Sequence, residues 1–205
     1  MSAYKCLFMK QCAPFLILLF FSARCVAKAE YADGYIISKK GDTLSCKIRI
    51  PVNLGKFNEL ELFSSVFILD SNNKDRKLKP KDINGYGFIY QSKKYVYVSK
   101  VVDDEDKMVF VWPQNLGKKI NEYYYYTFNS TNLAKGSMGA VDEVYVLEDE
   151  AKQTVSITRG GSLINSYKSQ LRKFFENDKQ LLRLIVDDVK DFHDIPKFVQ
   201  AANKL

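Results

Sequence analysis

The feature that most constrains the fold is a change in the period of the apolar residues along the chain. Before Gly160-Gly161, apolar and aromatic residues mostly alternate with polar ones, which is the pattern of half-buried β-strands. After these glycines they recur every three or four residues, as on one face of an α-helix. Many strands followed by about three helices predict an α+β fold, in which an antiparallel β-sheet or open barrel-like meander carries a helical C-terminal layer.

Polar turns divide the alternating part into strands. A first hairpin is expected over Tyr35 to Ile50, with its turn at Lys39-Lys40-Gly41-Asp42. Further strands are expected at Leu62 to Leu69, Ile83 to Gln91, Tyr95 to Val102, Met108 to Trp112, Ile120 to Phe128, Val144 to Leu147 and Thr154 to Thr158. The segment Asn129 to Gly139 has the polar, glycine-containing composition of a surface loop.

Three apolar stripes predict the helices. They run over Leu163 to Phe175, Leu181 to Val189 and Ile195 to Ala202. Residues suited to begin a helix precede them: Ser162, Asp178, and Asp194 with Pro196. The sequence therefore predicts three consecutive helices at the C-terminus.

Residues 1–29 have the layout of a secretory signal peptide. Two lysines precede an apolar run from Ala13 to Phe21, and Ala27-Lys28-Ala29 forms a small-x-small cleavage site. The apolar run is shorter than the ~20 residues that span a bilayer. We therefore expect cleavage between Ala29 and Glu30, no stable transmembrane segment afterwards, and export to the periplasm or surface of a Gram-negative bacterium.

Removal of this leader changes both the domain reading and the charge. Residues 30–205 are then expected to form a single globular domain, with a β-rich part over 30–159 and a helical part over 160–205. The leader holds four of the 31 basic residues and none of the 24 acidic ones, so the net charge falls from +7 to +3. A charge this small gives no argument for a nucleic-acid partner.

Catalytic and metal-binding patterns are weak. His193 is the only histidine, and Lys135-Gly136-Ser137-Met138-Gly139 lacks the first glycine of a nucleophile elbow. Cys46 is the one cysteine that follows the leader, and its alternating surroundings predict a buried small apolar residue. One histidine and one cysteine do not make a usual zinc site. We assign no catalytic residue, metal ligand or cofactor; a non-enzymatic role is favoured, while the enzyme question stays open.

Two features are candidates for partner binding. Four tyrosines, Tyr123, Tyr124, Tyr125 and Tyr126, share one expected strand, so alternate rings face opposite sides. One pair is expected to fill the core; the other, with Trp112, could contact a glycan or protein, unless both pairs pack under the helices. A basic segment, comprising Lys74, Arg76, Lys77, Lys79 and Lys81, could meet acidic head groups or phosphorylated glycans. Its alternative role is a charged edge that blocks strand-to-strand aggregation.

Short motifs resemble those of a family of uncharacterised secreted proteins of Bacteroidetes. The motifs are Gly34-Tyr35-Ile36-Ile37 with Gly41-Asp42-Thr43-Leu44, then Pro80-Lys81-Asp82-Ile83-Asn84-Gly85-Tyr86, and the helical ending around Leu171 to Leu181. This chain differs in having Cys46 where the family has a small residue, and in lacking a Tyr-Asn pair near its end. The resemblance implies export and an α+β fold, and it implies no catalytic residue.

These observations predict an exported envelope protein that acts as a non-enzymatic interaction or structural module. Its expected partner is an envelope protein or glycan, held by the aromatic strand and the basic segment. One alternative is a barrel-like protein that binds a small ligand or glycan, which a large aromatic-lined pocket would favour. A second is an envelope hydrolase, which two facing acids in a cleft, one with a raised pKa, would favour.

Overall fold

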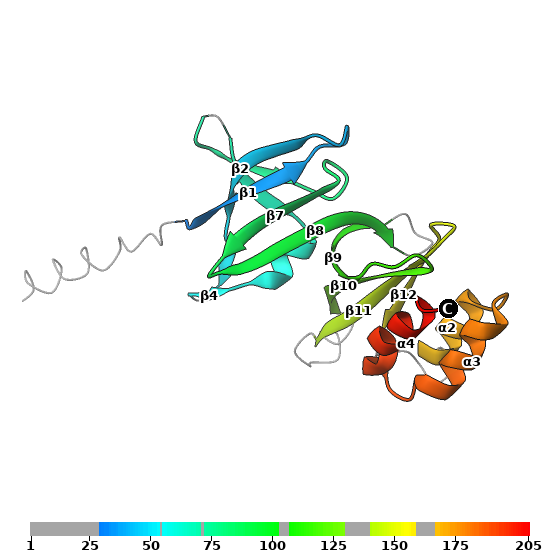
Figure 1. Cartoon of the computed structure of the whole chain (residues 1–205). Coiled ribbons are helices and arrows are strands. Elements are labelled where there is room, and N and C mark those ends of the chain that lie inside the picture. The colour runs from blue at the N-terminus through cyan, green and yellow to red at the C-terminus, as the bar shows by residue number, and fades with distance from the viewer. Residues whose placement is uncertain (1–28, 54, 71, 103–106, 130–139, 159–166) are drawn as a thin grey trace, which may run out of the picture. The chain divides into compact units, whose positions relative to one another are not determined.

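Ten strands form one open antiparallel sheet in the computed structural model of the chain, in the order β12-β11-β10-β9-β8-β7-β1-β2-β5-β6 (Figure 1). The strands are β1 (Tyr31–Ile37), β2 (Thr43–Arg49), β5 (Val66–Leu69), β6 (Asp75–Leu78), β7 (Gly85–Tyr90), β8 (Lys93–Val102), β9 (Lys107–Asn115), β10 (Ile120–Asn129), β11 (Ala140–Asp149) and β12 (Thr154–Thr158). A two-stranded hairpin adds β3 (Val52–Asn53) and β4 (Lys56–Phe57).

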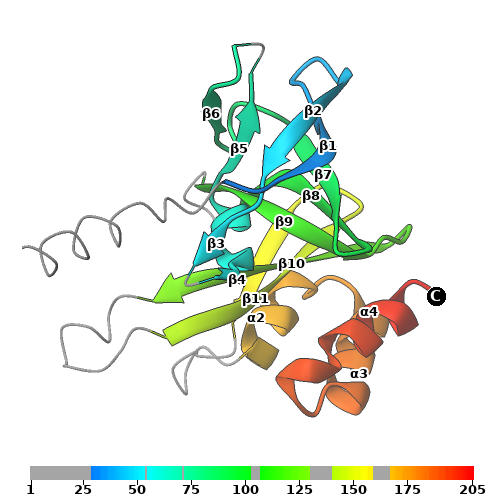
Figure 2. The same cartoon turned by 90° about the vertical axis from the view of Figure 1, so that its left-hand side faces the viewer.

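Three α-helices follow the strands and lie beside β10, β11 and β12 (Figures 1 and 2). They are α2 (Tyr167–Phe174), α3 (Lys179–Asp188) and α4 (Ile195–Ala202), with a short 3-10 helix η4 (Phe192–Asp194) before α4. The predicted α+β fold, a meandering antiparallel sheet followed by three helices, is thereby confirmed. No helix in the part of the chain that the structure describes is long and apolar enough to cross a membrane.

The structure describes residues 29–205 except 54, 71, 103–106, 130–139 and 159–166. Tyr31 to Leu205 form one unit by their internal contacts. The predicted leader up to residue 28, the candidate cap Ser162 and most of the expected loop after Asn129 lie outside the described residues.

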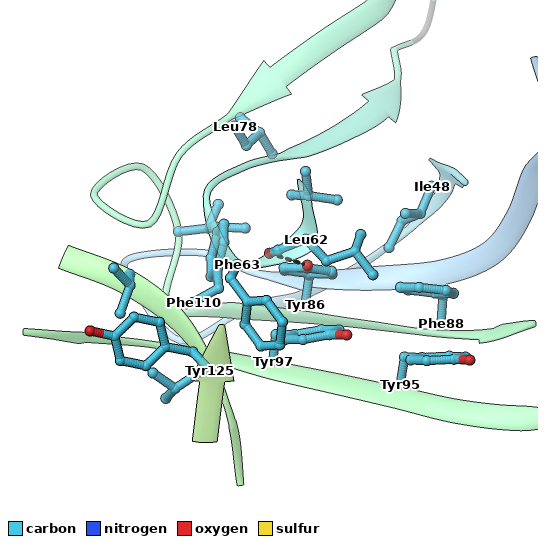
Figure 3. Close-up of a cluster of buried hydrophobic side chains, with 14 of the residues drawn as sticks. Ile48, Leu62, Phe63, Leu78, Tyr86, Phe88, Tyr95, Tyr97, Phe110 and Tyr125 are labelled. Atoms are coloured by element: carbon cyan, nitrogen blue, oxygen red, sulfur yellow. Dashed lines mark hydrogen bonds between the residues drawn. The ribbon is translucent and has the colours of Figure 1, made fainter. Parts of the chain in front are cut away.

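An aromatic core forms around β7, β8 and β9 (Figure 3). Tyr86 is fully buried, and its hydroxyl donates a 2.7 Å hydrogen bond to the Leu62 carbonyl oxygen. The Tyr97 ring stacks on Tyr86 at 4.9 Å, and Phe110 meets Tyr86 edge-on at 4.8 Å. Stacked and edge-on rings gain energy beyond their buried area. The alternating aromatics of β7, β8 and β9 therefore meet in one core, as their period predicts.

A second core forms between the helices and the last strands. Its buried residues come from both layers: Ile120, Tyr145, Leu147 and Ile157 from the strands, and Leu171, Ile185, Phe198 and Val199 from the helices. β10 and β11 contribute their other faces to the first core. These two strands are consequently buried on both sides, whereas most strands of an antiparallel sheet bury one.

Several strands differ from the sequence predictions, and the β3–β4 hairpin was not among the predicted elements. The expected strand Leu62 to Leu69 is wrong in its first part: Glu59–Phe63 form a 3-10 helix, η2, and only Val66–Leu69 form a strand. Leu62 and Phe63 are both buried, which neighbouring residues of a half-exposed strand cannot be. The basic segment was expected as an edge or a turn, and Asp75–Leu78 form the edge strand β6, paired to β5 alone.

Side-chain caps begin two of the C-terminal helical segments. The Asp178 carboxylate accepts hydrogen bonds from the backbone N–H groups of Gln180 and Leu181, so this predicted N-cap of α3 is confirmed. Asp194 precedes α4 as expected, but its carboxylate reaches backwards and completes a capping box with Asp191 around η4. A short helical turn thus sits between α3 and α4, and it brings His193 beside the sheet.

The end of the chain is fixed to the start of β10 through one amide side chain. Asn203 Oδ1 accepts hydrogen bonds from the backbone N–H groups of Lys119 (3.0 Å) and Ile120 (2.8 Å). Its Nδ2 donates to the Ile120 carbonyl oxygen at 2.8 Å. Gly117 packs directly against this amide, so that an added Cβ atom would clash with it. Asn203 therefore acts as a clamp that holds α4 against the sheet.

Replacement of Asn203 by alanine should lower the free energy of unfolding by about 2–3 kcal/mol, because three hydrogen bonds to part-buried backbone groups are lost at roughly 1 kcal/mol each. Urea unfolding followed by circular dichroism measures this change. Asn177→Ala, which removes an exposed amide between α2 and α3, is the matched control and should have little effect. Equal stability of the two variants would contradict the clamp.

Candidate functional site

The second core does not cover the whole helix-facing side of β10 and β11. Beyond its edge lies an open pocket of about 360 Å³ between β9, β10 and β11 on one side and η4 with the start of α4 on the other. This size falls within the range of small-molecule sites in proteins. Ten residues line it: Trp112, Gln114, Asn115, Glu122, Tyr124, Tyr126, Glu143, Tyr145, His193 and Pro196. We call it the acidic aromatic pocket.

Strand register places its aromatic residues together. Tyr124 lies opposite Trp112 of β9 and opposite Tyr145 of β11, so all three share one face of the sheet. The Tyr124 ring lies 5.0 Å from Tyr126 and 5.5 Å from Tyr145. Burial, followed by hydrogen bonding to Tyr126 and Glu143, raises the pKa of the Tyr124 hydroxyl well above its usual value. The hydroxyl therefore stays protonated and can donate.

Glu122 is the most unusual side chain of the pocket. It has no exposed surface, and Asn115 Nδ2 donates a hydrogen bond to its Oε2 atom. Its Oε1 atom is buried without a hydrogen-bond partner among the described residues. Burial raises the pKa of Glu122, and the hydrogen bond from Asn115 opposes that rise. A buried carboxyl oxygen without a partner costs free energy, so this residue calls for an explanation.

Glu143 and His193 stand nearer to solvent. Glu143 is half-buried and lies opposite Tyr126 in the β10–β11 register. His193 is exposed, and η4 carries it to the rim, where Phe192 anchors the turn by packing against Tyr145 at 4.9 Å. The pocket thus combines four aromatic rings and two carboxyl groups, with one imidazole at the rim.

A second buried glutamate, Glu148, has its negative charge compensated by a salt bridge and hydrogen bonds. Glu148 lies on the opposite face of β11 and forms a 2.7 Å salt bridge with Lys100. Tyr123 and Asn121 donate further hydrogen bonds to its Oε2 atom, at 2.8 and 3.2 Å. Burial alone would raise the pKa of Glu148, but these partners together lower it. Glu148 therefore belongs to a satisfied structural network, whereas Glu122 does not.

The structure separates the four tyrosines of the predicted aromatic surface. Tyr123 and Tyr125 are 6% and 4% exposed and belong to the first core, so neither reaches the surface. Tyr124 and Tyr126 are half-buried and line the acidic aromatic pocket together with Trp112. One pair thus fills the core as expected. The other forms part of a pocket rather than a flat contact surface, and Tyr126 also packs against Phe63 of the first core at 5.7 Å.

The basic segment lies elsewhere in the sheet. Lys74, Arg76, Lys77, Lys79 and Lys81 are all exposed, on or next to the edge strand β6. Six strands lie between β6 and β10 in the strand order, so the structure does not bring the basic segment and the tyrosines into one surface along the sheet. This placement is the one expected of a charged edge that discourages pairing with other chains.

Sequence analysis did not select Glu122, Glu143 or Tyr145 as site residues. The signal for Glu122 was present, because a charged residue stands in an otherwise aromatic strand, on the same face as Tyr124 and Tyr126. The sequence pattern around His193 predicts no catalytic or binding role for it. Its place at the pocket rim depends on η4, a short 3-10 helix that no periodic pattern in the sequence predicts.

Other chemistry has less support. No group of three or more His, Cys, Asp or Glu side chains suited to a metal ion occurs among the residues that the structure describes. Cys46 is half-buried against the first core, and burial raises the pKa of its thiol, which does not favour a nucleophile. No family profile, curated protein or solved structure matches the chain, so the geometry alone supports a function.

The two buried glutamates should respond to neutralisation with opposite signs. At pH values above the ordinary pKa of a glutamate, Glu122→Gln should be more stable than the wild type. The pKa of Glu122 is raised in the folded state, so the wild type loses stability as the pH rises, whereas the neutral glutamine does not. Glu148→Gln should lose about 1.5–3 kcal/mol at neutral pH through its charged hydrogen bonds. This loss should shrink as pH falls, because the pKa of Glu148 is lowered.

Urea unfolding of both variants and the wild type at about pH 7 and about pH 4 measures these differences. Each variant serves as the control for the other, since both replace a buried glutamate on neighbouring strands by its neutral isostere. If both variants changed the free energy of unfolding in the same direction at neutral pH, this would contradict the conclusion that the buried charge of Glu122 is not compensated.

Proposed function

We propose that the mature chain is an exported, non-enzymatic binding module of the cell envelope, which holds a small ligand in the acidic aromatic pocket. The leader-like residues 1–29 and the resemblance to secreted Bacteroidetes proteins support export. The pocket supports binding, because it presents aromatic surface and polar groups converging from three strands and η4. The ligand could be a free molecule or a group on an envelope glycan or protein.

The observation that carries this proposal is that the pocket is lined by a buried carboxyl group whose Oε1 atom has no hydrogen-bond partner among the described residues. The other buried carboxylate among the described residues, Glu148, is paired with Lys100. Natural proteins tolerate a local violation of the rule that buried charges are paired mainly at functional sites. Glu122 is such a violation, and it lies in the lining of an open pocket rather than in either core.

A hydrolase remains the second candidate, because two carboxyl groups line one pocket and the pKa of Glu122 is raised. A general acid must come within hydrogen-bonding distance of the leaving oxygen. Glu122 has no exposed surface, which fits this role less well than it fits a buried support for a bound group. Hydrolysis of glycans by the wild type and its abolition in Glu122→Gln would favour the hydrolase instead.

Ligand binding can be followed with the protein's own fluorescence, since Trp112 is the only tryptophan and lines the pocket. We expect at least one compound from a panel of glycans, amino sugars, amines and small acids to change this fluorescence and raise the melting temperature. Tyr126→Ala should weaken binding about tenfold, equivalent to about 1.4 kcal/mol, by removing one wall.

Phe128→Ala is the matched control, because it removes an exposed aromatic side chain on the same face of β10 outside the pocket. The Phe128→Ala variant should bind the ligand with the same affinity as the wild type. A full panel without binding, or equal weakening by both variants, would overturn the pocket as the functional site.

Export has its own test. Cells that express the full chain should yield a periplasmic or surface-associated protein whose first residue is Glu30, as determined by mass spectrometry of the intact protein. Recovery of uncleaved protein from the cytoplasm alone would contradict export and leave the pocket assignment unaffected.

A further inference from the structure

The charged groups that line the acidic aromatic pocket identify a class of ligand, if the pocket is the binding site proposed above. Basic residues outnumber acidic ones in the whole chain, 31 to 24, and still do so without the four basic residues of the leader, 27 to 24. Among the described residues that line the pocket, the carboxyl groups of Glu122 and Glu143 are present, and no lysine or arginine is. A site for an anionic ligand needs the reverse composition, because an anion near two carboxyl groups is repelled.

The aromatic lining favours a cation for an independent reason. The faces of Trp and Tyr rings carry partial negative charge and attract ammonium groups, and aromatic cages are the usual site for quaternary ammonium ligands. Trp112 already accepts such a contact in this fold: the Lys93 ammonium lies 4.7 Å from its ring centroid, although Lys93 does not line the pocket. Trp112, Tyr124, Tyr126 and Tyr145 together supply four rings.

The buried carboxyl of Glu122 is the third observation. Its Oε1 atom has no hydrogen-bond partner among the described residues, and its side chain is fully buried in the pocket lining. A positive charge in the pocket would compensate this carboxyl electrostatically, as Lys100 compensates Glu148 on the other face. A neutral sugar could supply hydrogen bonds to the half-buried Glu143, but it would bring no charge to the buried group.

We infer that the acidic aromatic pocket binds an organic ammonium ion, with the Glu143 carboxylate as its direct partner and the four aromatic rings as its walls. Glu122, which is buried in the pocket lining, stabilises the bound positive charge electrostatically without touching it. The imidazole of His193 stands at the rim, and its exposure leaves the pocket open to the rest of a larger ligand.

Choline chloride is the probe for this inference, and 3,3-dimethyl-1-butanol, its uncharged isostere, is the matched ligand control. Both are titrated into the mature protein at constant ionic strength, with Trp112 fluorescence and calorimetry as readouts. We expect choline to bind at least about tenfold more tightly than the isostere, the scale of a partly desolvated cation–π contact. Glu143→Gln should weaken choline binding about tenfold, and Asp187→Asn, an exposed carboxylate on α3, should leave it unchanged.

Three results would overturn the inference. Equal affinity for choline and its isostere would remove the role of charge, and unchanged choline binding by Glu143→Gln would remove the direct partner. Binding of a neutral or anionic compound from the panel, without choline binding, would overturn the ligand class and leave the pocket's binding function standing. Absence of binding by every compound would overturn the binding function as well, so the two failures are distinguishable.

Discussion

The burial of β10 and β11 on both faces is the constraint on which the rest of the structure depends. Because successive side chains of a strand point to opposite faces, every residue of these strands enters one of two environments. Tyr123 and Tyr125 enter the aromatic core, and Ile120 enters the core beneath the helices, with Tyr124 packed against it. The helical layer exists to cover the second face, and Asn203 and Phe192 hold that layer in position. The pocket arises where this cover ends.

The same constraint explains why two glutamates on neighbouring strands have opposite character. Glu148 points toward β8, where the Lys100 ammonium and the Tyr123 hydroxyl reach it. Glu122 lines the pocket that η4 borders, and its one hydrogen bond among the described residues comes from Asn115 of β9. A substitution of Glu122 by an apolar residue would relieve the cost of burial, so stability gives no reason for a carboxyl group there. Its presence is therefore better explained by function than by folding.

The sequence allowed much of this fold to be predicted, because period and turn chemistry are local properties. The alternation of β7 to β10, the hairpin turn around Gly41 and the Asp178 cap all depend on residues close together in the chain. The 3-10 helix η2 was missed because Leu62 and Phe63 are buried together by β9 and β10, which lie far along the sequence. The site was predicted only in part, because alternation is local whereas the cover of a strand face depends on residues far along the chain. Alternation separates Tyr124 and Tyr126 from Tyr123 and Tyr125, but it cannot say which face the helices cover or where that cover stops.

Charge illustrates how local placement outweighs composition. The chain is basic as a whole, and its net charge alone would predict an acidic partner. The structure puts the basic segment Lys74 to Lys81 on and around the edge strand β6, where repulsion between like charges protects an exposed edge. The acidic aromatic pocket lies between β9, β10, β11 and η4 and contains no lysine or arginine among its described lining residues. Electrostatic interactions weaken over about 8–10 Å in salt, so the pocket's carboxyl groups act more strongly on a bound group than the charges at the β6 edge of the sheet do. The proposed positive charge of the ligand therefore follows from Glu122 and Glu143 and not from the net charge of the protein.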